Sequence, residues 1–179
     1  KLLNRFRLRE IVSTDTIFSS VRADGGARCA QVFYGLTSHH MDVYGIESKS
    51  QFPEVYKEFI RDQEVPSGLH RDNAPEQKSN IITQINRDYE VKESFAESGN
   101  PNQNPVESRA IKWLKRAGER LLNHTGAPDF VWIWAYQYLA VVNNWTADRT
   151  LRWKCPHTKR FVVTPDISAL LSFHFYEPV

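Results

Sequence analysis

The chain has 179 residues, of which 41% are hydrophobic and 25% are charged, a composition typical of a single globular domain and not of a disordered segment. A formal net charge of +2 is too small to identify a nucleic-acid partner by itself, and the longest apolar run, residues 130–136, is too short to span a bilayer. Two cysteines are too few for a disulfide framework, so we expect an intracellular, reducing compartment. Because the longest apolar run is short, we expect no membrane partner.

The composition divides the chain into three segments. A basic lead-in covers residues 1–10, a core covers 11–148, and a basic extension covers 149–179. Because the chain begins at Lys1 and not at Met, and ends within an aromatic phrase, we expect it to be a piece of a longer chain.

The first part of the core predicts an antiparallel meander. Residues 11–18 are rich in β-branched side chains and contain one acid, Asp15, and the segments 27–36 and 41–47 predict two further strands separated by short turns. We expect His39 and His40, in the turn between these two strands, to face water.

Helices and short strands then alternate. Apolar residues at helical spacing predict a helix from about Ser50, and a short strand leads into Asp72. The apolar positions of the first helix are Phe52, Val55, Tyr56, Phe59 and Ile60. A second helix, capped by Ser79, would bury one row of side chains, namely Ile81, Ile82, Ile85 and Tyr89. Residues 90–97 alternate apolar and polar side chains, as in a fifth strand.

Two long helices are predicted after a loop over residues 98–105. The first runs from about 105 to 123, and its apolar stripe on a 100° wheel is Ala110, Leu114, Ala117 and Leu121, with Glu107 inside the stripe. The second covers about 130–147, and we expect its stripe to be core and not a stacking surface for bases. That stripe consists of Val131, Trp134, Ala135, Tyr138, Val142 and Trp145.

Three acids stand at positions that suit a metal site. Asp15 lies in a predicted strand, Asp72 follows a short strand, and Glu107 opens a helix. Two divalent cations held by such carboxylates can catalyse phosphoryl transfer. Each acid also has a simpler explanation: Asp15 could be a solvent-facing strand residue, and Glu107 could form a capping box with Asn104.

The helix that follows Glu107 is strongly basic. Its only other acid is Glu119, whereas its cations are Arg109, Lys112, Lys115, Arg116 and Arg120. A solvated helix face usually mixes the two signs more evenly, so this flank favours a phosphodiester substrate.

Three phrases of the sequence, TDTIF around Asp15, LHRDNAPEQ around Asp72 and NPNQNPVES around Glu107, resemble the catalytic core of retroviral-type integrases. The hallmark of that family is an Asp, Asp, Glu triad, and here 34 residues separate Asp72 from Glu107, one fewer than is usual. Phrases such as KSQFPEVYKEFIRDQEVP, GAPDFVWIWAYQYLAVVNN and TPDIS are similar to the polyproteins of copia-type long-terminal-repeat retrotransposons.

This resemblance implies an α/β, RNase H-like fold with a five-stranded mixed sheet flanked by helices. It implies two Mg²⁺ or Mn²⁺ ions bound by Asp15, Asp72 and Glu107, and it implies processing of DNA 3′ ends followed by strand transfer into target DNA. Further DNA contacts are implied for six residues: Asn102, Gln103 and Asn104 at the DNA ends, and Lys112, Lys115 and Arg116 at phosphates. The implied partners are double-stranded DNA and further copies of the chain. The implied locations are a cytoplasmic particle and then the host nucleus.

Two alternatives stay open. One is a catalytically inactive or domesticated module that binds DNA or serves assembly, and the presence of all three acids speaks against it. The other is an RNase H-like nuclease with RNA in its substrate, and the basic helix beside Glu107 favours the integrase over it.

Overall fold

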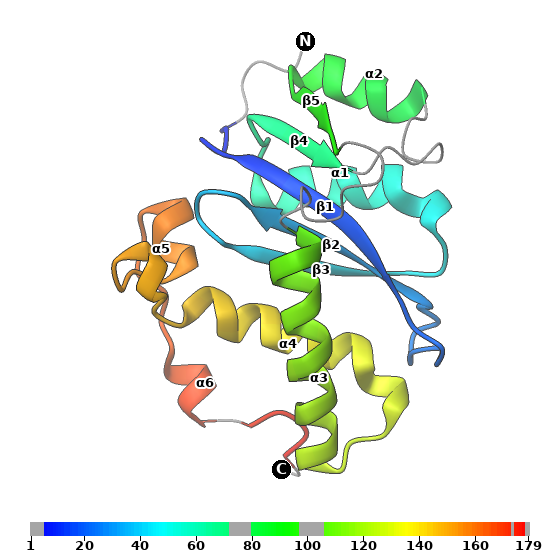
Figure 1. Cartoon of the computed structure of the whole chain (residues 1–179), viewed down its shortest axis with the longest axis vertical. Helices are drawn as coiled ribbons and strands as arrows, with labels where there is room; N and C mark the ends of the chain where they lie inside the picture. Colours follow the sequence, from blue (N-terminus) through cyan, green and yellow to red (C-terminus); the bar gives the residue numbers. More distant parts are fainter. Residues whose placement is uncertain (1–5, 72–79, 97–105, 173, 178–179) are drawn as a thin grey trace.

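The structure, a computed structural model, describes residues 6–71, 80–96, 106–172 and 174–177. Five strands form one mixed sheet in the order β3-β2-β1-β4-β5 (Figure 1). The strands are β1 (Ile11–Phe18), β2 (Cys29–Gly35), β3 (Met41–Ile46), β4 (Gly68–Arg71) and β5 (Lys92–Phe95). The first three pair antiparallel, whereas β4 and β5 join the sheet in parallel. This arrangement confirms the predicted α/β fold with a five-stranded mixed sheet.

Helices cover both faces of the sheet. The α1 and α2 helices pack on one face, and η4, α3 and α4 pack on the other (Figure 1). The longer elements are α1 (Phe52–Gln63), α2 (Asn80–Tyr89), η4 (Val106–Ile111), α3 (Lys112–Thr125) and α4 (Trp132–Trp145). Shorter helical pieces are η1 (Lys49–Gln51), η5 (Asp129–Val131), η6 (Arg149–Leu151), α5 (Pro156–Phe161) and α6 (Ser168–Ser172). No helix in the ranges that the structure describes is both long and apolar enough to cross a membrane.

The core beneath α1 and α2 follows the predicted helical spacing. All five apolar residues predicted for α1 are buried, and the Phe59 ring stacks on Phe33 of β2 with 4.4 Å between ring centroids. The expectation for α2 was partly wrong, since Ile81 is exposed and Asn86 is buried. Asn86 is buried because its side chain accepts a hydrogen bond from the hydroxyl of Tyr56, with 2.9 Å between the two atoms.

The core beneath α3 and α4 differs from the predicted stripe. Trp134 is 47% exposed, whereas Ile133 and Leu139 are buried. The α4 sequence is apolar around most of its circumference, so helical periodicity does not select the buried side. Contact with α3 selects it, because the two helices come so close that a Cβ on Gly118 would lie 2.4 Å from the Tyr136 ring.

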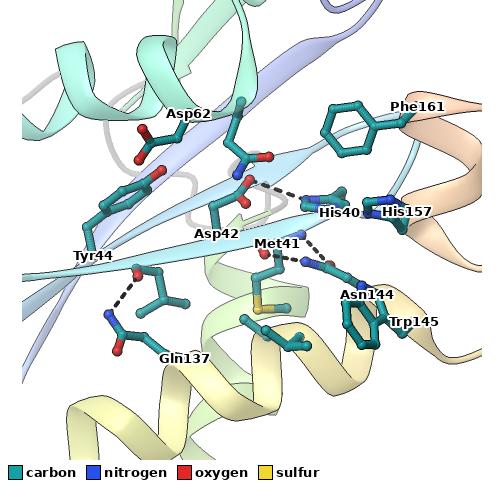
Figure 2. A pocket seen from close by; sticks show the side chains of 14 residues that line it. His40, Met41, Asp42, Tyr44, Asp62, Gln137, Asn144, Trp145, His157 and Phe161 are labelled. Atoms are coloured by element: carbon teal, nitrogen blue, oxygen red, sulfur yellow. Dashed lines mark hydrogen bonds and ion pairs between the residues drawn. The ribbon is translucent and has the colours of Figure 1, made fainter. Parts of the chain in front are cut away.

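Side-chain amides of α4 cover the edge strand β3. The Asn144 amide accepts from the Met41 N–H at 2.8 Å and donates to the Met41 carbonyl at 2.7 Å (Figure 2). Gln137 donates to the Val43 carbonyl at 3.4 Å. These bonds occupy backbone groups that an open sheet edge would offer to another chain, so α4 both packs on the sheet and closes its edge.

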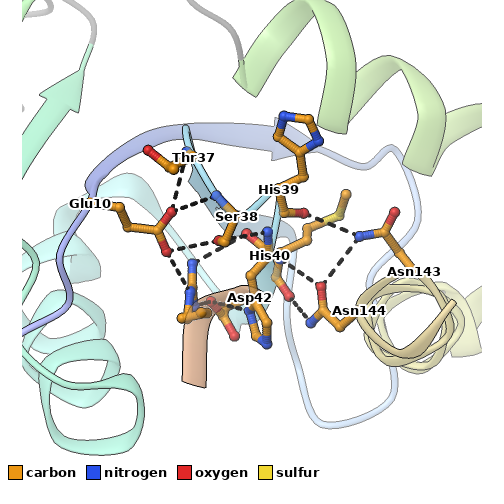
Figure 3. A network of polar contacts seen from close by, with 10 residues as sticks. Glu10, Thr37, Ser38, His39, His40, Asp42, Asn143 and Asn144 are labelled. Carbon is orange, nitrogen blue, oxygen red and sulfur yellow. Dashed lines mark hydrogen bonds and ion pairs between the residues drawn. The ribbon is translucent and has the colours of Figure 1, made fainter. Parts of the chain in front are cut away.

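A buried ionic network joins the lead-in, the turn before β3 and α5 (Figure 3). The side chain of Arg160 is 1% exposed and donates to Glu10 at 2.8 Å and to Asp42 at 2.7 Å. Glu10 also accepts from the backbone N–H and hydroxyl groups of Ser38.

The two turn histidines do not face water, contrary to the sequence expectation. His40 is 4% exposed because Phe161 and His157 of α5 pack against it. His39 is partly buried and pairs with Asp148 at 2.9 Å.

We expect Arg160→Met to lower the free energy of unfolding by about 3–5 kcal/mol, because it leaves the buried Glu10 and Asp42 carboxylates without their cation. Urea unfolding measures this loss. Lys159→Met, at the exposed neighbouring position, is the matched control and should change stability by less than about 0.5 kcal/mol. Equal stability of the two variants would contradict the importance of the network.

Candidate functional site

Asp15 lies in the middle of β1, on the face of the sheet that carries α3 and α4. Its partner across the antiparallel pair is Val32, and both Val32 and Ile17 belong to the core on that face. Because side chains alternate along a strand, Asp15 projects to the same side as Ile17. Its Oδ1 atom accepts a hydrogen bond from the Thr16 N–H at 2.7 Å, and the side chain is partly buried.

Glu107 lies in η4, which packs against β1 and β2 on this same face. The η4 segment is a π-helix, and its buried side chains are Val106, Ala110 and Ile111. Glu107 itself is exposed, so the prediction that it points inward with the apolar stripe was wrong. A π-helix has i→i+5 hydrogen bonds, so a wheel of 100° per residue does not apply to it.

The end of β4 lies beside Asp15. Arg71, the last residue of β4, is in register with Thr14 of β1, the residue before Asp15. Asp72 follows directly in the sequence and lies outside the described residues, as do Asn102, Gln103 and the proposed cap Asn104. The described residues therefore bring together β1, the end of β4 and η4, but they give no distances among the three carboxylates. Within the same residues there is no group of three or more His, Cys, Asp or Glu that could hold a metal ion.

The predicted DNA-binding cations Lys112, Lys115 and Arg116 are exposed on α3, directly after η4. No ion pair involves them in the part of the chain that the structure describes. Arg109, in η4, is exposed and interacts with the Tyr34 hydroxyl of β2. Burial raises the pKa of the Tyr34 hydroxyl, and a hydrogen bond with the Arg109 guanidinium partly offsets this effect.

A buried cation that was not predicted from the sequence lies beside the site. Arg71 is 0% exposed, and it donates from Nη2 to Glu93 at 3.0 Å and lies over the Phe95 ring. Glu93 also accepts from Asn86, so a polar chain links the end of β4 to α2 and, through Tyr56, to α1. An arginine within the short apolar strand GLHR was the available signal. Its ion pair fixes the last residue of β4.

A separate hollow of about 460 Å³ lies at the β3 edge, between α1, α4 and α5 (Figure 2). Its polar lining includes His40, Asp42, Tyr44, Asp62 and His157. Burial lowers the pKa of His40, so the ring is neutral at neutral pH. The two carboxylates of this hollow are already paired, Asp42 with Arg160 and Asp62 with Arg61.

Comparison with known proteins shows the fold. No protein-family model matches the sequence, and no curated protein matches it. Among solved structures, the chain is similar to the HTLV-2 integrase catalytic core domain in complex with magnesium, in trimeric form (TM-score 0.67, 14% identity, covering 86% of this chain and 97% of that one). The dimeric form of that domain gives a TM-score of 0.65 with 14% identity, covering 85% of this chain and 96% of that one.

A larger assembly matches as well. The simian T-cell lymphotropic virus intasome in complex with the PP2A regulatory subunit B56 gamma gives a TM-score of 0.70 at 14% identity. That match covers 89% of this chain and 58% of the other, so this chain spans somewhat more than half of that protein's length. The chain thus has the RNase H-like fold of retroviral integrase catalytic cores.

The buried network should give stability a defined pH dependence. Burial alone would raise the pKa of Asp42, but Arg160 and His40 outweigh it, and the pKa lies below its ordinary value of 3.8. A carboxyl with a depressed folded-state pKa stabilises the fold above about pH 4 and loses that contribution as the pH falls through the folded pKa.

We therefore expect Asp42→Asn to cost about 3 kcal/mol at pH 7, and the cost to shrink towards pH 3. Urea unfolding of both proteins across this range measures the difference. A cost that stays constant or grows in acid would contradict the assignment.

Proposed function

We propose, from the integrase-type fold and the placement of its acids, that this chain is the catalytic core of a copia-type retrotransposon integrase. It would process the 3′ ends of the element's DNA and join them to target DNA. The observation that carries the proposal is the convergence of Asp15, the end of β4 and the Glu107 segment on one region of the sheet. These are the three places at which the sequence carries the integrase-like motifs.

The donor set suits a hard divalent cation. Carboxylate oxygens are the ligands that Mg²⁺ and Mn²⁺ prefer. Asp15 accepts a hydrogen bond from the Thr16 N–H, Glu107 is exposed, and Asp72 directly follows Arg71 in the sequence. When bound, a pair of Mg²⁺ ions would activate the attacking oxygen and neutralise charge on the departing 3′ oxygen. A similar core from HTLV-2 was solved with magnesium.

The remaining residues hold the substrate. Lys112, Lys115 and Arg116 project from α3 next to η4, where they can neutralise DNA phosphates entering the site. By resemblance, Asn102, Gln103 and Asn104 precede η4 and would contact the DNA ends. Arg71 and Glu93 act as positioning residues, because they fix the strand from which Asp72 extends.

Several copies of this chain would act together on DNA. Joining two DNA ends to one target requires more than one core, and the similar HTLV-2 core was solved in dimeric and trimeric forms. We propose that copies of this chain assemble on double-stranded DNA, first in a cytoplasmic particle and then in the host nucleus.

Metal binding is the first test of the triad. We expect MnCl₂ to raise the stability of the wild-type chain, by about 1.4 kcal/mol at ten times the dissociation constant, because only the folded state assembles the carboxylates. Asp15→Asn and Asp72→Asn should lose most of this gain. Thermal unfolding with and without metal measures it, with CaCl₂ and NaCl of equal ionic strength as controls. Equal stabilisation of wild type and both variants would place the metal elsewhere.

Catalysis is the second test. We expect Glu107→Gln to reduce the reverse of strand transfer on a branched DNA about 100-fold or more in Mn²⁺, since one charged ligand is lost from the reacting centre. Glu119→Gln, the matched loss of the other acid from the same basic helix, should retain activity. If Glu107→Gln were as active as wild type, or if wild type had no activity while still binding DNA, the non-catalytic module would be the better assignment.

A further inference from the structure

A second surface on α3 lies apart from the proposed catalytic site. A hollow of about 510 Å³ opens between α3 and α4, with Trp113, Arg116, Arg120 and His124 on one wall and Leu139 on the other. We call it the α3 groove. Arg120 is 13 residues from Glu107, which corresponds to roughly 20 Å along a helix at 1.5 Å per residue. The Arg120 end of the groove is therefore too far away to be part of the carboxylate cluster, whereas the Trp113 end lies nearer to Glu107.

The groove wall carries two cations, Arg116 and Arg120. Four of the α3 residues that line it, Trp113, Arg116, Arg120 and His124, are spaced by three, four and four positions, so they lie on one face of the helix. Glu119, the single acid of α3, lines no part of the groove. Neither Arg116 nor Arg120 forms an ion pair in the part of the chain that the structure describes. Guanidinium groups without an acidic partner at a hollow favour an anionic ligand.

The same wall offers a stacking surface. Trp113 is 39% exposed although it is a large apolar side chain, and it stands one helical turn before Arg116. An indole ring beside guanidinium groups is the combination with which proteins bind nucleobases and the phosphates between them.

The α3 groove adjoins a second hollow. Leu121 and His124 are shared with a second hollow of about 460 Å³, which reaches Tyr138 and Tyr176. Figure 1 shows the C-terminal segment passing the far end of α3, where this second hollow lies. The two hollows adjoin at Leu121 and His124 and carry aromatic side chains at both ends, Trp113 in the first and Tyr138 and Tyr176 in the second. Their one acid, Glu177, lies at the end remote from Arg116 and Arg120.

The exposed Trp113 favours a single strand over a duplex. The bases of a duplex are paired and stacked on one another, so a duplex that offered its phosphate edge to Arg116 and Arg120 would leave Trp113 without a base to stack on. A single strand has unpaired bases whose faces are available for stacking. We propose that the α3 groove binds single-stranded nucleic acid, with a base on Trp113 and neighbouring phosphates on Arg116 and Arg120. This inference rests on the proposed function in one respect, because Arg116 is also one of the proposed DNA contacts, and it does not depend on the carboxylates.

The test is fluorescence anisotropy with a labelled oligothymidine of about twelve nucleotides, in EDTA so that no metal-dependent step occurs. We expect Trp113→Ala to weaken binding about fivefold or more, since one stacked base is lost. Arg120→Gln should weaken binding and lower the slope of log affinity against log salt by about 0.7, the value of one phosphate contact on a single strand. Trp113→Phe, which keeps a ring, should restore most of the affinity.

Matched controls come from elsewhere on the surface. Trp134→Ala removes a tryptophan of α4 that is 47% exposed, against 39% for Trp113, and Arg87→Gln removes an exposed arginine from α2. Both should bind the strand as wild type does, and circular dichroism should show that all variants are folded. Wild-type affinity in Trp113→Ala and Arg120→Gln would overturn the proposal. Tighter binding of a duplex that depends on Arg120 but not on Trp113 would overturn it as well, in favour of a phosphate contact to double-stranded DNA.

Discussion

The parallel pairing of β4 with β1 determines where the candidate site can form. β4 follows β1 by some 50 residues, and the register sets Arg71 beside Thr14. Parallel strands need a crossover, here supplied by α1, whose buried Phe59 packs on Phe33 in the sheet. Burial of α1 therefore fixes the end of β4 next to Asp15, and the ion pair of Arg71 with Glu93 fixes it further. Packing of α1 on one face of the sheet thus fixes the strand end that lies beside Asp15, whose side chain is on the opposite face.

The second constraint is the π-helical start of the long basic helix. Val106 and Ile111 bury themselves against β1 and β2, while Glu107 stays exposed between them in sequence. An exposed carboxylate keeps its hydration, which avoids the cost of burying an unpaired charge. Close packing of Gly118 against Tyr136 then anchors α3 on α4. The helix is thereby fixed along its length, while its first turn presents a polar group.

The local sequence pattern correctly predicted the elements that have one apolar and one polar face or a clear run of strand-forming residues. β1 begins and ends as its β-branched run predicts, and α1 buries the five apolar residues of its stripe. Helical periodicity did not predict which side chains of α4 are buried, because α4 is apolar around most of its circumference. It also failed for Glu107, because a wheel of fixed angle cannot describe a π-helix. His40 and Arg71 contact residues distant in the chain, Arg160 and Glu93 among them. The position of Arg71 in a short apolar strand indicated that it could be buried, but the local sequence does not identify either partner. For the candidate site, the motifs predicted Asp15 and Glu107, and the structure places both segments on one face of the sheet.

The central claim is that these carboxylates form one metal site. Crystals of the chain soaked in MnCl₂ and measured at the manganese absorption edge test it most directly. We expect anomalous density for manganese within about 2.0–2.3 Å of the carboxylate oxygens of Asp15 and of at least one of Asp72 and Glu107. Manganese bound elsewhere, with no density at Asp15 in a crystal whose site is open to solvent, would contradict it.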